Sequence, residues 1–177
     1  ACVLGVMKMT YEKLQVQNPI LRFSLYTHLQ AGTVIELGVT IKEQLDEMIQ
    51  NENVVDMSKG DPYGKVWLWV VGVYEVVRTM SDPKWKASWS DNYYSKILEY
   101  KKRIANLRVP FVKQEHRSGK PINLENSIWS IDFEKKSYLY EVEGDVFNIR
   151  DEIDGFEKLI KAIQPADVSY DLRENKS

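Results

Sequence analysis

The chain has 177 residues, of which 44% are hydrophobic and 28% charged, and its formal net charge is −2. These values are typical of one globular domain, and they exclude a generally disordered chain and an overall attraction to nucleic acid or anionic lipid. Cys2 is the single cysteine, which excludes an intramolecular disulfide and favours the reducing cytoplasm. The uncharged run 66–74 is much shorter than the roughly 20 residues needed to cross a bilayer, so we expect a soluble protein with no membrane partner.

Residues 21–39 are rich in β-branched and aromatic side chains on both sides of Gly32. This composition predicts two strands joined by a tight turn, and a helix over 23–29 is the alternative. Thr40 and Glu43 then have the spacing of a capping box, in which each side chain accepts a hydrogen bond from the other residue's backbone amide. A helix is therefore expected from about residue 41 into the low fifties.

The segment 61–81 is apolar on nearly every side, and Pro62 suits the first position of a helix because a missing N–H costs nothing there. A helix that is apolar all round has to be buried all round, so this segment is predicted to be the central helix of the fold. Gly72 lies inside it, although glycine costs about 1 kcal/mol relative to alanine in a helix. Gly72 therefore indicates the close approach of another backbone.

A further helix is predicted to start near Ser88 or Ser90, because apolar residues recur every three or four positions from Tyr93 to Phe111. Pro110 is expected to end or kink this helix.

From residue 128 the apolar period changes to two, which predicts an antiparallel hairpin over about 128–142. A last helix is expected from near Asn148 to Pro165. The segments 1–8 and 166–177 are expected to be flexible ends. Residues 1–177 are thus predicted to form a single α+β domain, with about four helices around a buried central helix (61–81) and one or two antiparallel hairpins, 128–142 and possibly 21–39.

Glu75 and Arg78 are charged residues on an apolar helix, within one turn of each other. One interpretation is an internal salt bridge that fixes the helix register. The alternative is a cleft that binds a small molecule, lined by Glu75 and Arg78 with Trp67 and Tyr74, in which Glu75 acts as an acid or base.

Nine of the twenty aromatic residues lie between residues 63 and 100. Trp and Tyr side chains of this kind favour cores, subunit interfaces and ligand pockets. We expect core packing for most of them and a subunit contact through Trp85, Trp89 and Tyr93, on the loop at 81–94.

Residues 96–120 hold eight Lys and Arg and only two Asp and Glu, so one helix face is basic. Lys101, Lys102, Arg103 and Arg108 could contact phosphates, although a charged helix face is more often simply solvated. Separately, five residues lie between Arg22 and His28, a spacing that resembles the arginine-to-histidine motif of HEPN-type ribonucleases, a helical family found in bacterial toxins. The resemblance covers two residues and carries no catalytic role across, because that family places its motif on a late helix.

Neither histidine has a metal-ligand companion, and no phosphate loop or nucleophile with its base is present in the sequence, so we expect no metal site and no cofactor. The absence of such sites favours a non-catalytic, cytoplasmic interaction protein, as a homodimer, over an enzyme. Two alternatives stay open: a HEPN-like nucleic-acid-associated protein of a toxin or defence system, and a small-molecule pocket or enzyme built around Glu75 and Arg78. The pocket or enzyme alternative requires a cavity beside Gly72.

Overall fold

The computed structural model describes residues 10–50, 54–110 and 130–169. It is mostly helical with one small antiparallel sheet, which confirms the expected α+β class. Its elements in chain order are α1 (Tyr11–Gln17), α2 (Ile20–Phe23), α3 (Leu25–Met48), α4 (Tyr63–Met80), α5 (Asp91–Arg108), β1 (Ser130–Asp132), β2 (Ser137–Val142), β3 (Asp145–Asn148) and α6 (Ile149–Lys161), with short 3-10 helices at Met57–Lys59, Pro83–Ser88 and Pro165–Asp167.

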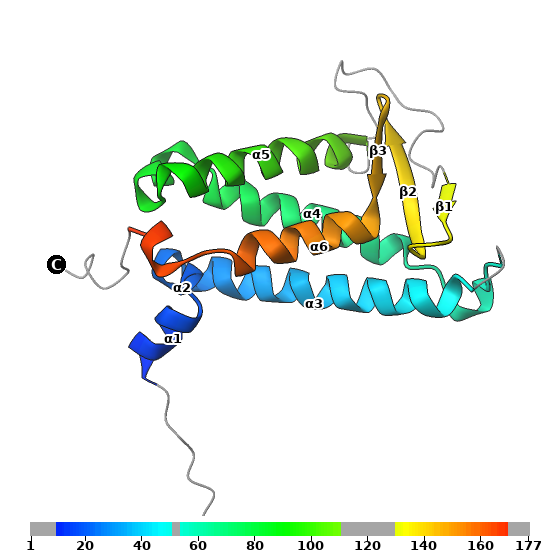
Figure 1. Ribbon diagram of the computed structural model, residues 1–177, viewed down its shortest axis with the longest axis horizontal. Coiled ribbons are helices and arrows are strands. Elements are labelled where there is room, and N and C mark those ends of the chain that lie inside the picture. The colour runs from blue at the N-terminus through cyan, green and yellow to red at the C-terminus, as the bar shows by residue number, and fades with distance from the viewer. Residues whose placement is uncertain (1–9, 51–53, 111–129, 170–177) are drawn as a thin grey trace, which may run out of the picture.

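The long helices α3, α4 and α5 lie side by side as one layer, with α4 in the middle (Figure 1). α6 crosses one face of this layer and contacts both α3 and α5. The sheet lies at the end of the layer where α3 finishes, and it contacts α6 through β2 and β3. The layer therefore has one face that α6 covers and one that it does not.

The segment 21–39 is helical, so the predicted hairpin there is wrong. Ser24 caps α3 by accepting a hydrogen bond from the backbone of Thr27, and the helix then continues for 24 residues. The buried residues of α3 recur every three or four positions, which places them in one stripe against the rest of the fold. Burial of this stripe outweighs the strand preference of the β-branched residues. They are Thr27, Ala31, Val34, Gly38, Ile41, Leu45 and Met48.

The capping box at Thr40 is also not a helix start. Thr40 lies inside α3, and its hydroxyl donates to the carbonyl of Glu36 at 3.1 Å, a bond that a threonine makes within an existing helix. The predicted helix beginning near residue 41 is therefore the second half of α3.

The predicted central helix is confirmed as α4, but not its complete burial. Five of its six valines form a buried stripe with Trp69 and Met80, whereas Trp67 is 38% and Leu68 is 54% exposed. These two side chains point away from the stripe, on the face of the layer that α6 leaves open. The apolar residues of α4 therefore form an exposed face as well as a buried stripe.

The later elements follow the predictions closely. Ser90 caps α5, β1 and β2 form the expected hairpin within its described part, and Asn148 caps α6. The strand β3 was not predicted, because the expected hairpin ended at about residue 142. Gly144 instead adopts a φ of 88° in a tight turn, which suits glycine and lets β3 pair with β2.

The C-terminal segment is also more ordered than expected in its first residues. Val168 is 2% exposed and forms an isolated bridge with Trp89, and the backbone N–H of Ser90 donates to the carbonyl of Asp167 at 2.8 Å. Residues 166–169 are thus fixed against the start of α5 and are not part of a flexible end. The other expected flexible residues, 1–8 and 170–177, lie outside the described residues.

Candidate functional site

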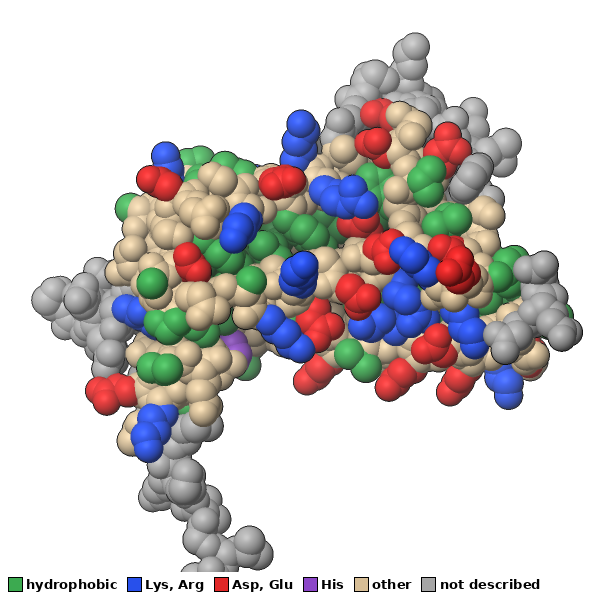
Figure 2. Space-filling view, in the orientation of Figure 1, with side chains coloured by type: hydrophobic (Ala, Val, Ile, Leu, Met, Phe, Trp, Pro, Cys, Tyr) green, Lys and Arg blue, Asp and Glu red, His purple; other side chains and the backbone are tan. Residues whose placement is uncertain are grey.

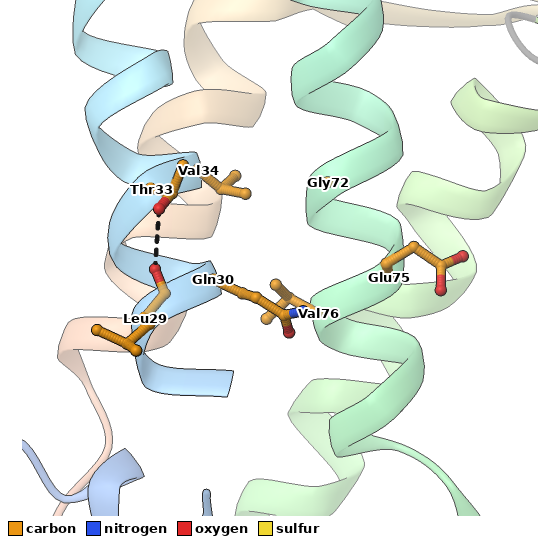
Figure 3. A pocket seen from close by; sticks show the side chains of 7 residues that line it. All are labelled: Leu29, Gln30, Thr33, Val34, Gly72, Glu75 and Val76. Atoms are coloured by element: carbon orange, nitrogen blue, oxygen red, sulfur yellow. Dashed lines mark hydrogen bonds between the residues drawn. The ribbon is translucent and has the colours of Figure 1, made fainter. Parts of the chain in front are cut away.

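A groove of about 300 Å³ lies between α3 and α4, on the face of the layer opposite α6. The expected close approach at Gly72 forms its floor, because a Cβ at that position would lie 2.8 Å from Cγ2 of Val34. Figure 3 shows Val34 directed toward α4 at the level of Gly72, with Gln30 and Val76 one turn further along. The residues that line it are Leu29, Gln30, Thr33, Val34, Gly72, Glu75 and Val76.

The polar groups of the groove are not arranged for acid–base chemistry. The Thr33 hydroxyl donates to the carbonyl of Leu29 at 3.1 Å, and the Glu75 carboxylate points away from α3 (Figure 3). Glu75 accepts a hydrogen bond of 2.8 Å from Nε of Arg78, and this contact raises the pKa of the guanidinium. The groove is therefore an apolar cleft with a paired carboxylate at its edge.

The pair Glu75–Arg78 is a surface pair and not the predicted internal salt bridge. The Arg78 and Glu75 side chains are 52% and 44% exposed, so water solvates both ends of the pair. A pair of this exposure contributes little to stability. Two charges on an apolar helix suggested a buried pair. They lie instead on the uncovered side of α4, where water solvates them and no cost of burying a charge arises.

The groove belongs to a wider apolar face. Leu68 and Gly72 are four residues apart on α4 and therefore point to the same side. On α5, Leu98 is four residues after Tyr94, whose hydroxyl donates to the α4 carbonyl of Ser81, so Leu98 lies on the α4 side of α5. We name this surface the outer face, and its members are Leu29, Thr33, Trp67, Leu68, Gly72, Glu75, Arg78 and Leu98.

The outer face exposes large apolar side chains. Leu29 and Leu68 are each 54% exposed, Leu98 is 42% and Trp67 is 38% exposed. Exposed large apolar side chains on three adjacent helices make this face a candidate interaction surface.

The predicted ligand residues divide between the groove and its surroundings. Only Glu75 lines the groove. Trp67 lies on the outer face, and Tyr74 is half-buried with its ring covered by the guanidinium of Arg108, 4.2 Å from the ring centroid. The four residues therefore do not converge on one pocket.

The predicted interface residues are mostly core. Trp89 and Tyr93 are 4% and 1% exposed, and they stack on each other with centroids 5.6 Å apart. Phe23 of α2 contacts both Trp89 at 4.7 Å and Trp85 at 6.0 Å. This aromatic cluster fastens α2 to the start of α5, so Trp89 and Tyr93 cannot reach a second subunit. A pattern of aromatic residues does not by itself distinguish a core from an interface.

The basic residues of α5 have separate roles. Arg103 forms two hydrogen bonds of 2.9 Å to the buried carboxylate of Glu152 on α6, and this pairing raises the pKa of the guanidinium. Arg108 covers Tyr74. Lys101 and Lys102 make no ion pair with any described residue. The predicted phosphate-binding face is thus interrupted by two arginines that hold elements of the fold together.

Arg22 and His28 lie on different helices. Arg22, in α2, donates from Nη1 to the carbonyl of Pro165 at 2.7 Å, which ties α2 to the C-terminal segment. His28 is in the first turn of α3, and burial lowers its pKa. Arg22 therefore makes a structural contact. This agrees with the absence of the late-helix position that the HEPN motif has in its family.

In the three described ranges, no group of three or more His, Cys, Asp and Glu side chains is placed to hold a metal ion. None of the described helices is long and apolar enough to cross a membrane.

Most of the groove was missed from the sequence because its α3 side lies in the segment interpreted as a hairpin. Leu29 and Thr33 are four residues apart, so a helical interpretation of 21–39 would have placed them on one face next to Gly72. Gly72 was the one correct signal. Comparison with protein-family models, curated proteins and solved structures finds no match to this chain.

Proposed function

We propose that this protein is a non-catalytic interaction protein that forms a homodimer through its outer face. The main observation behind this proposal is the exposure of Leu29, Trp67 and Leu68 around a groove in which no side chains are arranged for acid–base catalysis. Burying these side chains against a second copy removes apolar area from water at roughly 25 cal/mol per Å².

The size of the outer face fits a dimer. α4 has 18 residues and is therefore about 27 Å long at 1.5 Å per residue. Three helices packed about 8–10 Å apart span roughly 25 Å, so the footprint is on the order of 700 Å² per copy. A specific complex of standard size buries about 800 Å² per partner.

Gly72 supports the same proposal. It lines the groove in the middle of the face, and an apolar side chain of a second copy could enter this groove. Interfaces are strongest where a large side chain fills a pocket near the centre. A single cysteine in the chain also fits the cytoplasm as the place of such an assembly.

The test is the molar mass across a wide concentration range, by sedimentation equilibrium. We expect the wild type to show a dimer, and Leu68→Glu to shift it to a monomer because a carboxylate would be buried at the contact. Val146→Glu is the matched control, since Val146 is 49% exposed on β3 and lies off the outer face. A wild type that stays monomeric at the highest concentration, or two variants with the same effect, would contradict the proposal.

The groove supports a second candidate, the binding of a small apolar molecule. Its volume of about 300 Å³ is at the lower limit of ligand pockets, and Leu29, Val34 and Val76 make it apolar. Gly72→Val would fill the groove, so a fluorescent apolar probe that binds the wild type should lose affinity for this variant. A probe that binds both proteins equally would contradict this candidate. Nucleic-acid binding has less support, because Arg103 and Arg108 are engaged within the chain.

A further inference from the structure

We infer that, in the homodimer proposed above, the two-fold axis runs parallel to α4, so that the acidic edge of α3 in each copy faces the basic edge of α5 in the other. The inference rests on that dimer and adds its geometry. It follows from the placement of charges that have no ion-pair partner among the described residues.

Charges on the covered side are paired inside the protein. Lys42 bonds to Asp154 at 2.7 Å, and Arg150 bonds to Asp46 at 2.8 Å. Figure 2, which views the α6 side, shows acidic and basic side chains close together there. This side of the protein has satisfied its own charges.

The charged residues at the two edges of the outer face differ from those on the covered side. Glu36, Glu43 and Glu47 are exposed along α3, and they make no ion pair with any residue in the described ranges. Figure 2 shows acidic side chains along this α3 edge. On the α5 side, Lys102 is exposed and Lys101 is half-buried toward α4, and neither forms an ion pair with a residue in the described ranges. We name these two groups the acidic edge and the basic edge.

Two copies that meet face to face are related by a two-fold axis in the plane of the contact, and its two limiting directions are perpendicular and parallel to the helices. An axis perpendicular to the helices places α3 on α3, so that both acidic edges meet and both basic edges meet. An axis parallel to the helices places α3 of one copy on α5 of the other. Like charges brought together at an interface cost several kcal/mol and opposite charges steer association, so the charge pattern selects the parallel axis.

The position of Glu36 along α3 agrees with this choice. Val34 faces Gly72, so Glu36 lies only about 3 Å further along, at 1.5 Å per residue. The contact of Tyr94 with Ser81 makes α5 antiparallel to α4 and places Lys101, two turns after Tyr94, near the level of Gly72. Rotation about an axis parallel to α4 keeps each residue at its own level. Glu36 of one copy therefore comes close to Lys101 of the other.

The contact is isologous, so it occurs twice in the dimer. Each copy contributes one acidic and one basic edge, and Trp67 and Leu68 lie near the axis between them. The arrangement has an apolar centre and a charged rim, which is the usual anatomy of an interface.

The experiment uses two charge reversals of the full chain, with the dimer dissociation constant as the readout. One variant carries Glu36→Lys and Glu43→Lys, the other Lys101→Glu and Lys102→Glu. Each should weaken the dimer by about tenfold or more, because both rim contacts become repulsive. The combined fourfold variant should restore the dissociation constant to within about threefold of the wild type. Circular dichroism checks that every variant is folded, as expected for surface substitutions.

Mixing distinguishes the two axes. The fourfold variant should form dimers with itself but not with the wild type, as measured by native mass spectrometry, because acid would then meet acid and base would meet base. With the perpendicular axis it would prefer the wild type, and that result overturns the inference. The control Glu134→Lys/Glu141→Lys changes the net charge equally at exposed sites of the hairpin and should leave the dimer unchanged.

The outcomes separate the inference from the proposed function. A wild-type dimer that neither reversal weakens overturns the parallel arrangement and leaves the dimer standing. A monomeric wild type overturns both.

Discussion

The two faces of the α3–α4–α5 layer show how the same helices can be closed on one side and open on the other. Gly38 and Gly72 make the contrast at single positions. A Cβ at Gly38 would lie 2.7 Å from Ile153 of α6, so that depression is already filled. A Cβ at Gly72 would meet Val34 of α3 at 2.8 Å instead, and Gly72 also lines the groove between α3 and α4.

The chemistry of the covering element explains the difference. α6 buries Ile153 and Phe156, and Phe156 meets Trp69 edge to face at 6.4 Å. Ion pairs also join Arg150 and Asp154 of α6 to α3, and Glu152 of α6 to α5. In the described part of the chain, no element supplies an equivalent apolar stripe for the outer face. The comparison teaches that exposed apolar residues on α4 are a surface that the chain leaves available.

The largest expected effect is on the covered side. Phe156→Ala removes a fully buried ring that contacts Trp69 and Tyr100, and it should lower the free energy of unfolding by about 3–5 kcal/mol. The matched outer-face variant Leu68→Ala should change the stability of the monomer by no more than about 0.5 kcal/mol. Urea unfolding at a concentration below dimerisation measures both. Equal losses would mean that the outer face is as much a part of the core as the α6 side.

A smaller effect is expected at the pair that joins α5 to α6. Glu152 is 2% exposed and Arg103 is its ion-pair partner, so Arg103→Met leaves a buried carboxylate without a counter-charge. We expect a loss of about 2–3 kcal/mol, somewhat less than for a fully buried pair because the arginine is half exposed. Thermal unfolding provides the measurement.

The contrasting variant is Arg78→Met on the outer face, which leaves a half-exposed Glu75 and should cost less than about 0.5 kcal/mol. If Arg78→Met destabilises the protein more than Arg103→Met, the distinction between a paired covered side and an open face is lost.

Unfolding at alkaline pH is a third test of the side that α6 covers, and here the expected loss of stability is gradual. Burial raises the pKa of Tyr93, Tyr100, Tyr138 and Tyr140 above the ordinary value of about 10. Their contribution is fully present below pH 10 and is lost as the pH rises toward the folded pKa values, because the unfolded chain releases these protons first. Each tyrosine should lower the free energy of unfolding by about 1.4 kcal/mol per pH unit in that range.

The check is urea unfolding at several pH values above 9, together with the ultraviolet absorbance of tyrosinate. Tyr93→Phe should reduce the slope of the free energy of unfolding against pH by the contribution of one tyrosine. It also removes a hydrogen bond to the carbonyl of Leu159. A pH-independent stability in this range would show that these hydroxyls are open to water.

The boundaries of α4, α5 and α6 could be predicted because local signals coincide with tertiary ones. Ser90 and Asn148 each start a helix with a polar side chain, and an apolar stripe of the right period follows both caps. The first half of α3 was not predictable in this way. Its β-branched residues favour a strand locally, and only their burial against α4 selects the helix.

The candidate site was predicted in one feature. Gly72 was identified as a close-approach position, and the groove lies beside it. The residues opposite on α3 could not be assigned while that segment was interpreted as strand. Glu75 and Arg78 were recognised as unusual, but their exposure depends on which side of α4 remains uncovered, and no local pattern reports that.

The amino-acid sequence by itself determined the class of the fold, the starts of α4, α5 and α6, and the close contact at Gly72, because caps, periodicity and glycine act over a few residues. The tertiary structure alone decided that Trp89 and Tyr93 are core, that Arg103 holds α6, and that Leu68 is exposed on α4. The physical reason is that burial is a property of distant segments: α6 follows α4 by almost 70 residues, and its place on one face of the layer determines what the other face exposes.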